Sequence, residues 1–597
     1  MEVTPGRSGD QPSVELVAVP PPAVGSEGDC DVALAGVLLA RDGIVSDGRE
    51  GSDAEIIAAA YNRHGAAVLP RLRGSFALVL TDRTRREVFC LRDPLGSHPL
   101  FYADLGSKIL LSPSLECLRR HPDVPSDLNA AALVDHLCHR WPDPGETLFA
   151  SIRRVPVAHL LRIGSAGSHV ERYWELPTPE DWIEDDELES FDSLFERAVA
   201  RPAALGRVGI YLSGGFDSVS VAAVASDLAK RRADPSPVAL SLAFPHPECN
   251  EQDVQQSVAS KLQLPQVLMP FDDAVSPGGL VASGIELSAR LPLPLLNPWR
   301  PAYVSLARAG RDDGCDVILT GAGGDEWLTV NPMYMADLLR GGDIVAAAGF
   351  ARTLLRSYRR SRPGMIRFLA WQAGLRPLVL LAGRRAARRF TPEVVRAKRR
   401  RDLRTLAPPW VAPSGTLARE VAERIEQRVD QRMREPEPSG GYGFYFRGMD
   451  SPLLHPERSR EQEEEFAIGR ALGLRVQHPY WDPDLVSFLC RVPPRLLLAN
   501  GREKGLVRET TNRRFPGAGF ERQRKVSAVT FFKERLEAEA LPHWRKMGGG
   551  TALASIGIVD PRLVDPTTEA PSPAGRLRRL NELWELMALE AWTRRRL

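Results

Sequence analysis

The chain has 597 residues, of which 43% are hydrophobic and 26% charged, and its formal net charge is +2. A single hydrophobic core does not extend over this length, so we expect two or more domains. The near-neutral balance excludes the global field of a nucleic-acid-binding protein, and we expect no nucleic-acid partner. The seven cysteines form no C-x-x-C pair, so neither a zinc ribbon nor a disulfide framework is indicated.

Targeting signals and long apolar runs are also missing from the sequence. The first residues, MEVTPGRSGDQPS, lack the basic-then-apolar order of a signal peptide. The most apolar runs, such as residues 377–383, are far below membrane-spanning length. We therefore expect a cytoplasmic protein with no membrane partner.

The first part of the chain is dominated by strand-like patterns. Residues 1–30 are rich in Pro, Gly and small polar types, which predicts a loose N-terminal tail or an irregular strand. From Asp31 onward DVALAGVLLA alternates apolar and small residues, as a strand does. A helix is expected to begin at Ser52 or Asp53 and to end near Arg63. Two strand-like runs, SFALVLTD and EVFCLRD, and a strand-to-helix segment, ILLSPSLECLRR, come next.

An acidic, proline-bearing segment separates this part from the rest of the chain. We take residues 177–190 as a linker, which gives a first domain over 31–176 and a second over 191–597. In the second domain, apolar strands (RVGIYL, VALSLAF, QVLMPF and DVILTG) alternate with helical segments. This alternation predicts a parallel sheet covered by helices on both faces, and the pattern after Asp337 is mostly helical.

A glycine-rich turn, SGGFDS at residues 213–218, lies between the first of these strands and a helix. Its two glycines let backbone amides approach a phosphate, and the helix N-terminus adds unpaired N–H donors. Ser213 and Ser218 offer hydroxyls to the same anion. Asp217 would repel a phosphate by itself, so it predicts a Mg²⁺ ion beside the phosphates. The alternative is a plain turn with a helix-start charge, which the strand–helix context disfavours.

A second loop of this kind, LTGAGGDE at residues 319–326, also follows an apolar strand. In parallel sheets ligands bind beyond the carboxyl ends of the strands, so both loops should face one site. Asp325 is then a second magnesium carboxylate, and Glu326, a candidate catalytic base, follows it. The alternative is a glycine-rich turn with capping acids.

The turn at 213–218 resembles the PP-loop of ATP pyrophosphatases, which implies attack on the α-phosphate of ATP and an AMP-linked intermediate. Over nearly the whole chain, the order of motifs resembles the asparagine synthetase family, in which a class II glutamine amidotransferase domain precedes a PP-loop synthetase domain. The matching segments are SDAE (52–55), GSFA (74–77), RDPLG (92–96), PLFY (99–102), SGGFDS (213–218), TGAGGDE (320–326), PYWD (479–482) and KGLVR (504–508).

This resemblance implies an α/β fold with two parts: an Ntn-type α-β-β-α sandwich and a parallel-sheet synthetase domain with a helical extension. It also implies ATP and Mg²⁺ as cofactors. Magnesium would bridge Asp217 and Asp325, and Lys504 would stabilise the charge that develops on phosphate and oxyanion. A lysine on a basic helix surface is the alternative for Lys504. The nucleotide would be bound by Leu212 and Leu242 at the adenine and by Ser213, Gly214, Gly215, Ser218, Thr320, Gly321 and Gly323 at the phosphates.

The first domain departs from the family pattern. Glutamine hydrolysis there needs an N-terminal cysteine whose α-amine activates the thiol, whereas this chain begins Met1-Glu2 and its nearest cysteine is Cys30. The loops that hold glutamine are also missing between Leu39 and Ser52. We therefore expect a degenerate domain without glutaminase activity, with a structural or partner-docking role.

The second departure is Ala322, which stands where asparagine synthetases have Glu and β-lactam synthetases have Tyr. A GxGGDE loop without an N-terminal cysteine resembles the lasso-peptide cyclases, or macrolactam synthetases, which adenylate an Asp or Glu side chain of a ribosomal core peptide. The peptide's N-terminal amine then closes the ring. The resemblance implies three partners: the core peptide, a leader-binding protein and a leader peptidase. The alternatives are a β-lactam synthetase, an ammonia-dependent asparagine synthetase-like ligase, and a non-catalytic ATP- or partner-binding homologue.

Several residues remain open at this level. The base for the attacking amine is unassigned, with Glu326 and the run 463–465 as candidates. That run is more typical of a solvated helix face, and His455 and His478 are more typical of structural histidines. The helical segment 333–448 is expected to roof the cavity. Its dense basic cluster reads as solvated helix surface or as a guide for an acidic peptide or partner protein; it comprises Arg384, Arg385, Arg388, Arg389 and residues 398–401.

Overall fold

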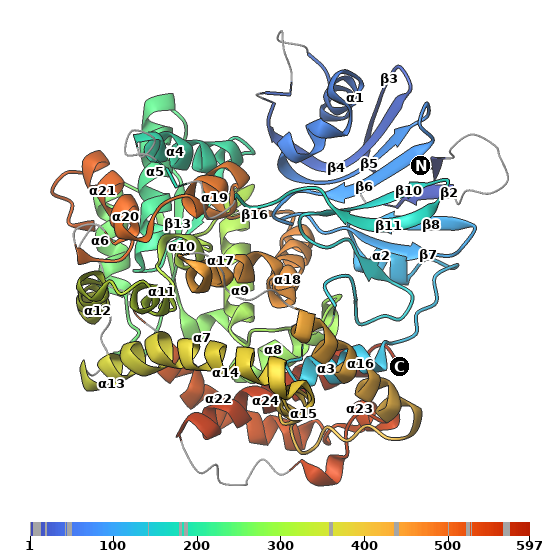
Figure 1. The fold of residues 1–597 in the computed structure, drawn as a ribbon. Coiled ribbons are helices and arrows are strands. Elements are labelled where there is room, and N and C mark those ends of the chain that lie inside the picture. Colours follow the sequence, from blue (N-terminus) through green and yellow to red (C-terminus); the bar gives the residue numbers. More distant parts are fainter. Residues whose placement is uncertain are drawn as a thin grey trace.

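The computed structural model shows two domains in contact, a β-sandwich at the upper right of Figure 1 and a larger α/β domain beside and below it. The structure describes residues 2–3, 13–17, 21–41, 43–44, 50–140, 143–177, 182–183, 189–357, 362–434, 441–498, 501–520, 526, 528–564 and 573–597.

Two facing sheets make up the first domain. The larger has the order β11-β10-β6-β5-β4-β3 and is antiparallel throughout, and the smaller has the order β1-β2-β8-β7-β9. The strands are β1 (Glu2–Val3), β2 (Ser13–Leu16), β3 (Ala23–Glu27), β4 (Cys30–Ala40), β5 (Arg73–Asp82), β6 (Glu87–Arg92), β7 (Phe101–Asp104), β8 (Lys108–Ser112), β9 (Arg153–Arg154), β10 (His159–Gly164) and β11 (Gly167–Arg172).

Helices cover the outer faces of the sandwich. In β5, Leu78 and Leu80 pack toward α1 (Asp53–His64), whereas Ala77 and Val79 point between the sheets. This period of two buries both faces of the strand. On the other side, α2 (Leu115–Arg119) packs on β7 and β8, and α3 (Ala130–Leu137) follows it. The layers confirm the predicted α-β-β-α sandwich.

The start of α1 lies where its sequence signals predict. The Glu55 N–H donates to Ser52 Oγ at 3.3 Å, and the Ser52 N–H donates to Glu55 Oε2 at 2.8 Å, which completes a capping box. The helix ends before Gly65, whose φ of 62° suits a residue without a side chain.

Of the two alternatives for residues 1–30, the described residues form strands, and the loose tail is wrong for them. Strands β1, β2 and β3 lie in this range, β2 pairs in parallel with β8, and β3 pairs with β4. Val14 and Leu16 are buried between the sheets, while Glu15 between them is less so. The reason is a period-two apolar pattern too short to stand out from the surrounding Pro and Gly, stabilised by pairing with distant strands.

The described part of the expected linker is anchored on the second domain. The Trp182 ring lies 5.0 Å from that of Tyr442 and 5.2 Å from that of Phe446. The Ile183 N–H donates to the carbonyl of Arg491 at 3.0 Å.

A five-stranded parallel sheet, with the order β14-β13-β12-β15-β16, forms the centre of the second domain. Its strands are β12 (Val208–Tyr211), β13 (Val238–Ala243), β14 (Gln266–Pro270), β15 (Val317–Leu319) and β16 (Arg475–Gln477). The first four match the predicted strands. The fifth strand, β16, was not predicted, because its three residues, RVQ, include only one apolar residue and form no recognisable strand pattern.

The strand order locates a binding crevice. The chain leaves β12 toward β13 and β14, and later returns to the other side of β12 as β15 and β16. Ligands in open parallel sheets bind beyond the carboxyl ends of strands at such a reversal. The crevice therefore lies between the loops that follow β12 and β15, which are the two glycine-rich turns.

Helices pack on both faces of this sheet and continue to the C-terminus (Figure 1). They are α4 (Ser190–Ala203), α5 (Phe216–Arg232), α6 (Gln252–Leu262), α7 (Phe271–Ala274), α8 (Gly279–Arg290), α9 (Arg300–Asp312), α10 (Gly324–Leu328), α11 (Tyr334–Arg340), α12 (Ile344–Ser357), α13 (Arg362–Arg367), a π-helix (Phe368–Leu375), α14 (Arg376–Phe390), α15 (Pro392–Arg404), α16 (Gly415–Arg434), α17 (Gly443–Leu454), α18 (Pro456–Leu472), α19 (Pro483–Cys490), α20 (Pro494–Leu497), α21 (Gly505–Arg514), α22 (Val529–Lys546), α23 (Thr551–Ser555) and α24 (Pro573–Arg594).

One helical stretch differs from the expectation about apolar runs. Pro363–Ala387 is long and apolar enough to cross a membrane by length and composition, and 33% of its most apolar window is buried in the protein. The apolar run predicted at residues 377–383 is by itself too short to span a membrane. The apolar run in the structure is longer, because it also includes the preceding π-helix.

Candidate functional site

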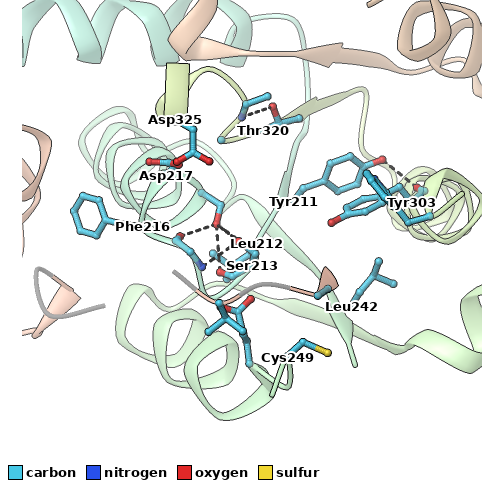
Figure 2. Close-up of a pocket in the computed structure, with 18 of the residues that line it drawn as sticks. Tyr211, Leu212, Ser213, Phe216, Asp217, Leu242, Cys249, Tyr303, Thr320 and Asp325 are labelled. Carbon is cyan, nitrogen blue, oxygen red and sulfur yellow. Dashed lines mark hydrogen bonds between the residues drawn. The ribbon is translucent and has the colours of Figure 1, made fainter. Parts of the chain in front are cut away.

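The turn after β12 is closed by its own hydroxyl groups. Ser213 N–H donates to Ser218 Oγ at 3.2 Å, Gly215 N–H donates to Ser213 Oγ at 3.1 Å, and the two hydroxyl oxygens are 3.0 Å apart (Figure 2). The helix that starts at Phe216 points its N-terminus at the crevice. This geometry is that of an anion-binding turn.

The loop after β15 packs directly on this turn, and glycines make the contact possible. A Cβ at Gly321 would lie 2.6 Å from the Ser218 amide nitrogen, and one at Gly324 would lie 2.3 Å from Asp217 Cγ. Side chains at either position would push the two loops apart. The predicted convergence of the loops is thus present in the structure.

Lys504 joins the two loops through their acids. Its Nζ lies 2.6 Å from both carboxylate oxygens of Asp217 and 2.8 Å from Asp325 Oδ1. Burial alone would lower the pKa of Lys504, but the two carboxylates raise the pKa above its ordinary value. The lysine is therefore a permanent cation at the head of the crevice.

The two carboxylates that the sequence predicts for Mg²⁺ face the Lys504 ammonium in this structure, and its nitrogen lies within 2.8 Å of three of their oxygens. Asp217 and Asp325 supply the oxygen ligands that Mg²⁺ prefers. Within the described ranges, no group of three or more His, Cys, Asp or Glu side chains could hold a metal ion by itself. A magnesium ion with one or two protein carboxylates, completed by substrate phosphates, fits this donor set.

A cavity of about 570 Å³ opens in front of the three residues. Of the predicted site residues, its wall includes Leu212, Ser213, Gly215, Asp217, Ser218, Leu242, Thr320, Gly321, Asp325 and Lys504. Apolar and aromatic side chains line another part of the wall: Leu240, Phe244, Trp299, Leu306 and Phe532. One part of the wall thus suits phosphates and another suits a flat apolar group.

Three predicted residues lie outside this wall. The Gly214 N–H points at Glu251 and donates to its Oε2 at 3.1 Å. Gly323, with φ +100°, packs on the PYWD segment, since a Cβ there would lie 2.7 Å from Tyr480 Cβ. Glu326, on the first turn of α10, is half-buried away from the cavity, so the geometry does not favour it as the base.

Glu251 was not predicted from the sequence. Burial raises its pKa, and the Gly214 N–H that it accepts opposes the shift. The Glu251 carboxylate thus accepts the N–H of one residue of the phosphate-binding turn, Gly214. The chain order could have indicated Glu251, because it follows β13 and therefore lies at the same edge of the sheet as the two glycine-rich turns.

The acidic run of α18 is buried, and the prediction of a solvated helix face is wrong. Glu464 Oε1 lies 2.5 Å and Glu465 Oε1 2.8 Å from the Arg300 guanidinium. Glu463 lies between Arg154 and Arg92 of the first domain. Each acid meets an arginine from another element, which the local sequence cannot reveal.

Glu465 also connects to the second glycine loop. His478 Nε2 lies 2.8 Å from Glu465 Oε2, and His478 Nδ1 lies 2.7 Å from Thr320 Oγ1. Burial raises the pKa of Glu465, but His478 and Arg300 lower it well below its usual range. His478 was expected to be structural, and it bridges the cavity wall and the loop. His455 caps α18 by accepting the Glu457 N–H.

The first domain holds no activated thiol at Cys30. Cys30 is 1% exposed at the start of β4, and burial raises its pKa to about 12. A thiol of this kind is not a nucleophile at neutral pH. This agrees with the expectation that Cys30 does not hydrolyse glutamine.

Comparison with known proteins identifies both domains. The asparagine synthase family model matches residues 190–594, and the glutamine amidotransferase domain model matches residues 45–174. The chain therefore belongs to the asparagine synthase family. This confirms the predicted fold class, an amidotransferase-like sandwich followed by a PP-loop synthetase domain.

Individual relatives are distant. The amidase chyE of Penicillium rubens is 29% identical over 315 residues, which cover 48% of this chain and 44% of that protein. The glutamine-hydrolyzing asparagine synthetase 3 of Bacillus subtilis is 30% identical over 179 residues, 29% of each chain. A putative asparagine synthetase of Mycobacterium tuberculosis is 28% identical over 302 residues, 49% of this chain and 43% of that protein. The chain thus spans less than half the length of these curated relatives.

Proposed function

We propose that this protein is an ATP-dependent amide ligase that closes a macrolactam ring in a ribosomal peptide of the lasso type. It would adenylate an Asp or Glu side chain of the core peptide and join it to the peptide's N-terminal amine. The observation that carries the ligase assignment is the Lys504 ammonium held between Asp217 and Asp325, at the head of a cavity of about 570 Å³.

The first half-reaction uses the two glycine-rich loops. The triphosphate lies over the turn at 213–218, where amides and the helix N-terminus stabilise its charge. A substrate carboxylate oxygen forms a bond to the α-phosphorus, the bond from that phosphorus to the bridging oxygen breaks, and pyrophosphate leaves. Lys504 neutralises the charge of the departing group. Asp217 and Asp325 would hold Mg²⁺ with the nucleotide's phosphates, and the ion would supply charge neutralisation when bound.

The second half-reaction forms the amide. The peptide amine attacks the acyl carbon, AMP leaves with the electron pair of the acyl–oxygen bond, and the amine loses one proton. An α-amine has a pKa near 8, so it is partly neutral at cellular pH and needs little help from a base. Glu465, with His478 behind it, is the cavity-lining carboxylate of the acidic run on α18. Because His478 and Arg300 hold the pKa of this carboxylate well below its usual range, it is a weak base, and we propose that it orients the amine while the proton is lost to solvent.

The choice of a peptide substrate rests on Ala322 and on the first domain. Ala322 lines the cavity with a methyl group, so it adds neither a carboxylate nor a phenol to the site. The Cys30 thiol is buried and its pKa is raised, which does not favour it as a source of glutamine-derived ammonia, and the proposal takes the amine from the substrate itself. A leader-binding protein and a leader peptidase would deliver the peptide and free its amine; these partners, like the cytoplasmic location, are part of the proposal.

One experiment tests the assignment. The full chain is incubated with ATP, Mg²⁺ and a leader-free peptide that has a free N-terminus and an Asp or Glu, and the peptide mass is read. Loss of one water with release of AMP and pyrophosphate is the expected result. Turnover with aspartate and ammonia, or with a β-amino acid only, would establish one of the rival ligases instead. Binding of ATP without turnover of any substrate would favour a non-catalytic homologue.

A further inference from the structure

The helical stretch from 362 to 390 has a surface that the proposed reaction does not use. Here α13, the π-helix Phe368–Leu375 and α14 follow one another without a break and form one long rod in the lower part of Figure 1. Part of this stretch is as apolar as a membrane-spanning helix. It lies outside the wall of the ATP cavity.

One face of the rod is fixed to the protein. Met365, Leu369 and Ala373, spaced four residues apart, are buried in the core of the second domain. At Gly374 a Cβ would lie 2.8 Å from the Leu339 side chain of α11. Because this face is packed into the core, the rod cannot cross a bilayer as a separate helix.

The opposite face carries a row of exposed apolar side chains. Ile366 is 54% exposed, Trp371 47%, Leu375 48% and Val379 58%. Trp371, Leu375 and Val379 are spaced four residues apart, like the buried residues. Trp371 comes two residues after the buried Leu369, so the exposed row lies about half a helical turn away from the buried face. Large exposed side chains in one row mark an interaction surface, whereas single ones are ordinary.

The charge along the same stretch has one sign. Between positions 362 and 390 the sequence has seven arginines and no aspartate or glutamate. Arg367, Arg376 and Arg384 are exposed. The neighbouring α15 and α16 are joined by two ion pairs, Arg396–Asp430 and Arg400–Glu426. These two acids are therefore already paired with arginines of α15.

We propose that this face, the row Ile366, Trp371, Leu375 and Val379 with its flanking arginines, binds an anionic lipid bilayer with the rod lying in the interface plane. Apolar and aromatic side chains on one face with arginines beside them are the features of a helix that lies on anionic lipid. A protein interface is rimmed by mixed polar groups, whereas every charged side chain of this stretch is an arginine. The inference is independent of the ligase reaction and departs from the expectation of no membrane partner.

Vesicle flotation with the purified full chain tests this. We expect binding to vesicles of phosphatidylcholine with phosphatidylglycerol, little binding to phosphatidylcholine alone, and release by salt. The double variant W371S/L375S removes two apolar side chains from the row, and its partition coefficient on anionic vesicles should fall by roughly tenfold or more. The variant R376Q/R384Q should reduce the salt-sensitive part of binding.

A matched control separates the row from exposed apolar residues in general. Val24 on β3 is 54% exposed, in the other domain, and V24S should bind vesicles as the wild type does. The thermal unfolding midpoint of each variant checks that the fold is intact. No flotation of the wild type with anionic vesicles would overturn the proposal and leave this face to an acidic protein. Equal binding by the wild type and W371S/L375S would also overturn it.

Discussion

At the scale of single residues, Lys504 is the side chain on which the site depends most. Its ammonium faces two carboxylates within 2.8 Å, and its backbone has a φ of +63°, which a residue with a side chain rarely adopts. A strained backbone at the head of a helix is tolerated where surrounding contacts fix it, and such positions gather at functional sites. Lys504 is buried, so it is not a surface lysine, and its strain and charge support the role proposed for it.

Lys504→Met should abolish most of the turnover. The variant keeps much of the side-chain volume but leaves Asp217 and Asp325 to repel the phosphates, and loss of such a charge costs roughly a hundredfold to a thousandfold in kcat. Release of AMP and pyrophosphate measures the effect, and the unfolding midpoint shows whether the protein is folded. Folded K504M with wild-type AMP release would contradict the assignment. Asp217→Ala should be similarly inactive, as a metal ligand predicts.

Ala322→Tyr tests the peptide-sized cavity. A phenol at this half-buried wall position fills space that the proposed peptide needs, so kcat/KM for the peptide should fall by roughly tenfold or more. The KM for ATP should change little, since the proposal places the phosphates on the turn at 213–218. Ala322→Ser, with one added oxygen, is the matched control and should stay near wild type. A peptide reaction unchanged in A322Y would mean that the substrate does not pass Ala322.

At the scale of secondary-structure elements, α18 links the two domains to the active site. Glu463 on this helix binds Arg154 of the first domain, with Arg154 Nη2 to Glu463 Oε2 at 2.8 Å. Two turns of the same helix carry Arg458, Glu461 and Glu465, which line the cavity. The amidotransferase-like domain thus contacts the helix that forms one wall of the cavity.

Arg154→Met should destabilise the protein through this helix. Removal of one partner of a buried ion pair leaves an uncompensated charge and costs about 3–5 kcal/mol. The unfolding midpoint should drop clearly, and KM for the peptide should rise even at temperatures where the variant is folded. In the cycle of R154M, E463M and R154M/E463M, the double variant should lose less stability than the sum of the two single losses, although it also leaves Arg92 without Glu463. A double loss equal to that sum would show that the pair is not coupled.

The sequence predicted those parts of the site that follow from chain order. Asp217 and Asp325 each lie in the first turn of a helix that follows an apolar strand and a glycine-rich turn, and parallel strands bring such positions to one edge. The burial of Glu463 to Glu465 could not be predicted. A run of acids has the same local sequence pattern whether it faces water or, as here, Arg154 and Arg300. Strand β2 shows the same limit, since its four residues are a strand only beside β8.

At the scale of the whole molecule, the order of strands and helices was enough to predict both domain architectures. The relative position of the domains was not, because it depends on pairs between residues hundreds of positions apart. His139 at the end of α3 and Glu585 on α24 form one such pair, with His139 Nε2 3.0 Å from Glu585 Oε2. Arg73 and Asp484 form another, at 2.7 Å.

The His139–Glu585 pair predicts that the contact between the domains depends on pH. The hydrogen bond to Glu585 raises the pKa of His139, burial opposes this, and the nearby charges of Glu585, Glu457 and Glu582 add to the rise. A group whose pKa is higher in the folded state stabilises fully below its unfolded pKa of about 6.5, and this stabilisation is lost as pH rises through the folded value.

The comparison of wild type with His139→Asn measures this effect. Asparagine suits the positive φ of this position, 47°, so the variant removes the charge without adding backbone strain. The difference in unfolding midpoint should be larger at about pH 5.5 than at about pH 8.5, because the stabilisation is lost as pH rises through the folded pKa of His139. Glu585→Gln, which keeps the shape of the partner, should give the same pH dependence. A midpoint difference that is constant across this range would show that the charge of His139 does not contribute to the contact between the two domains.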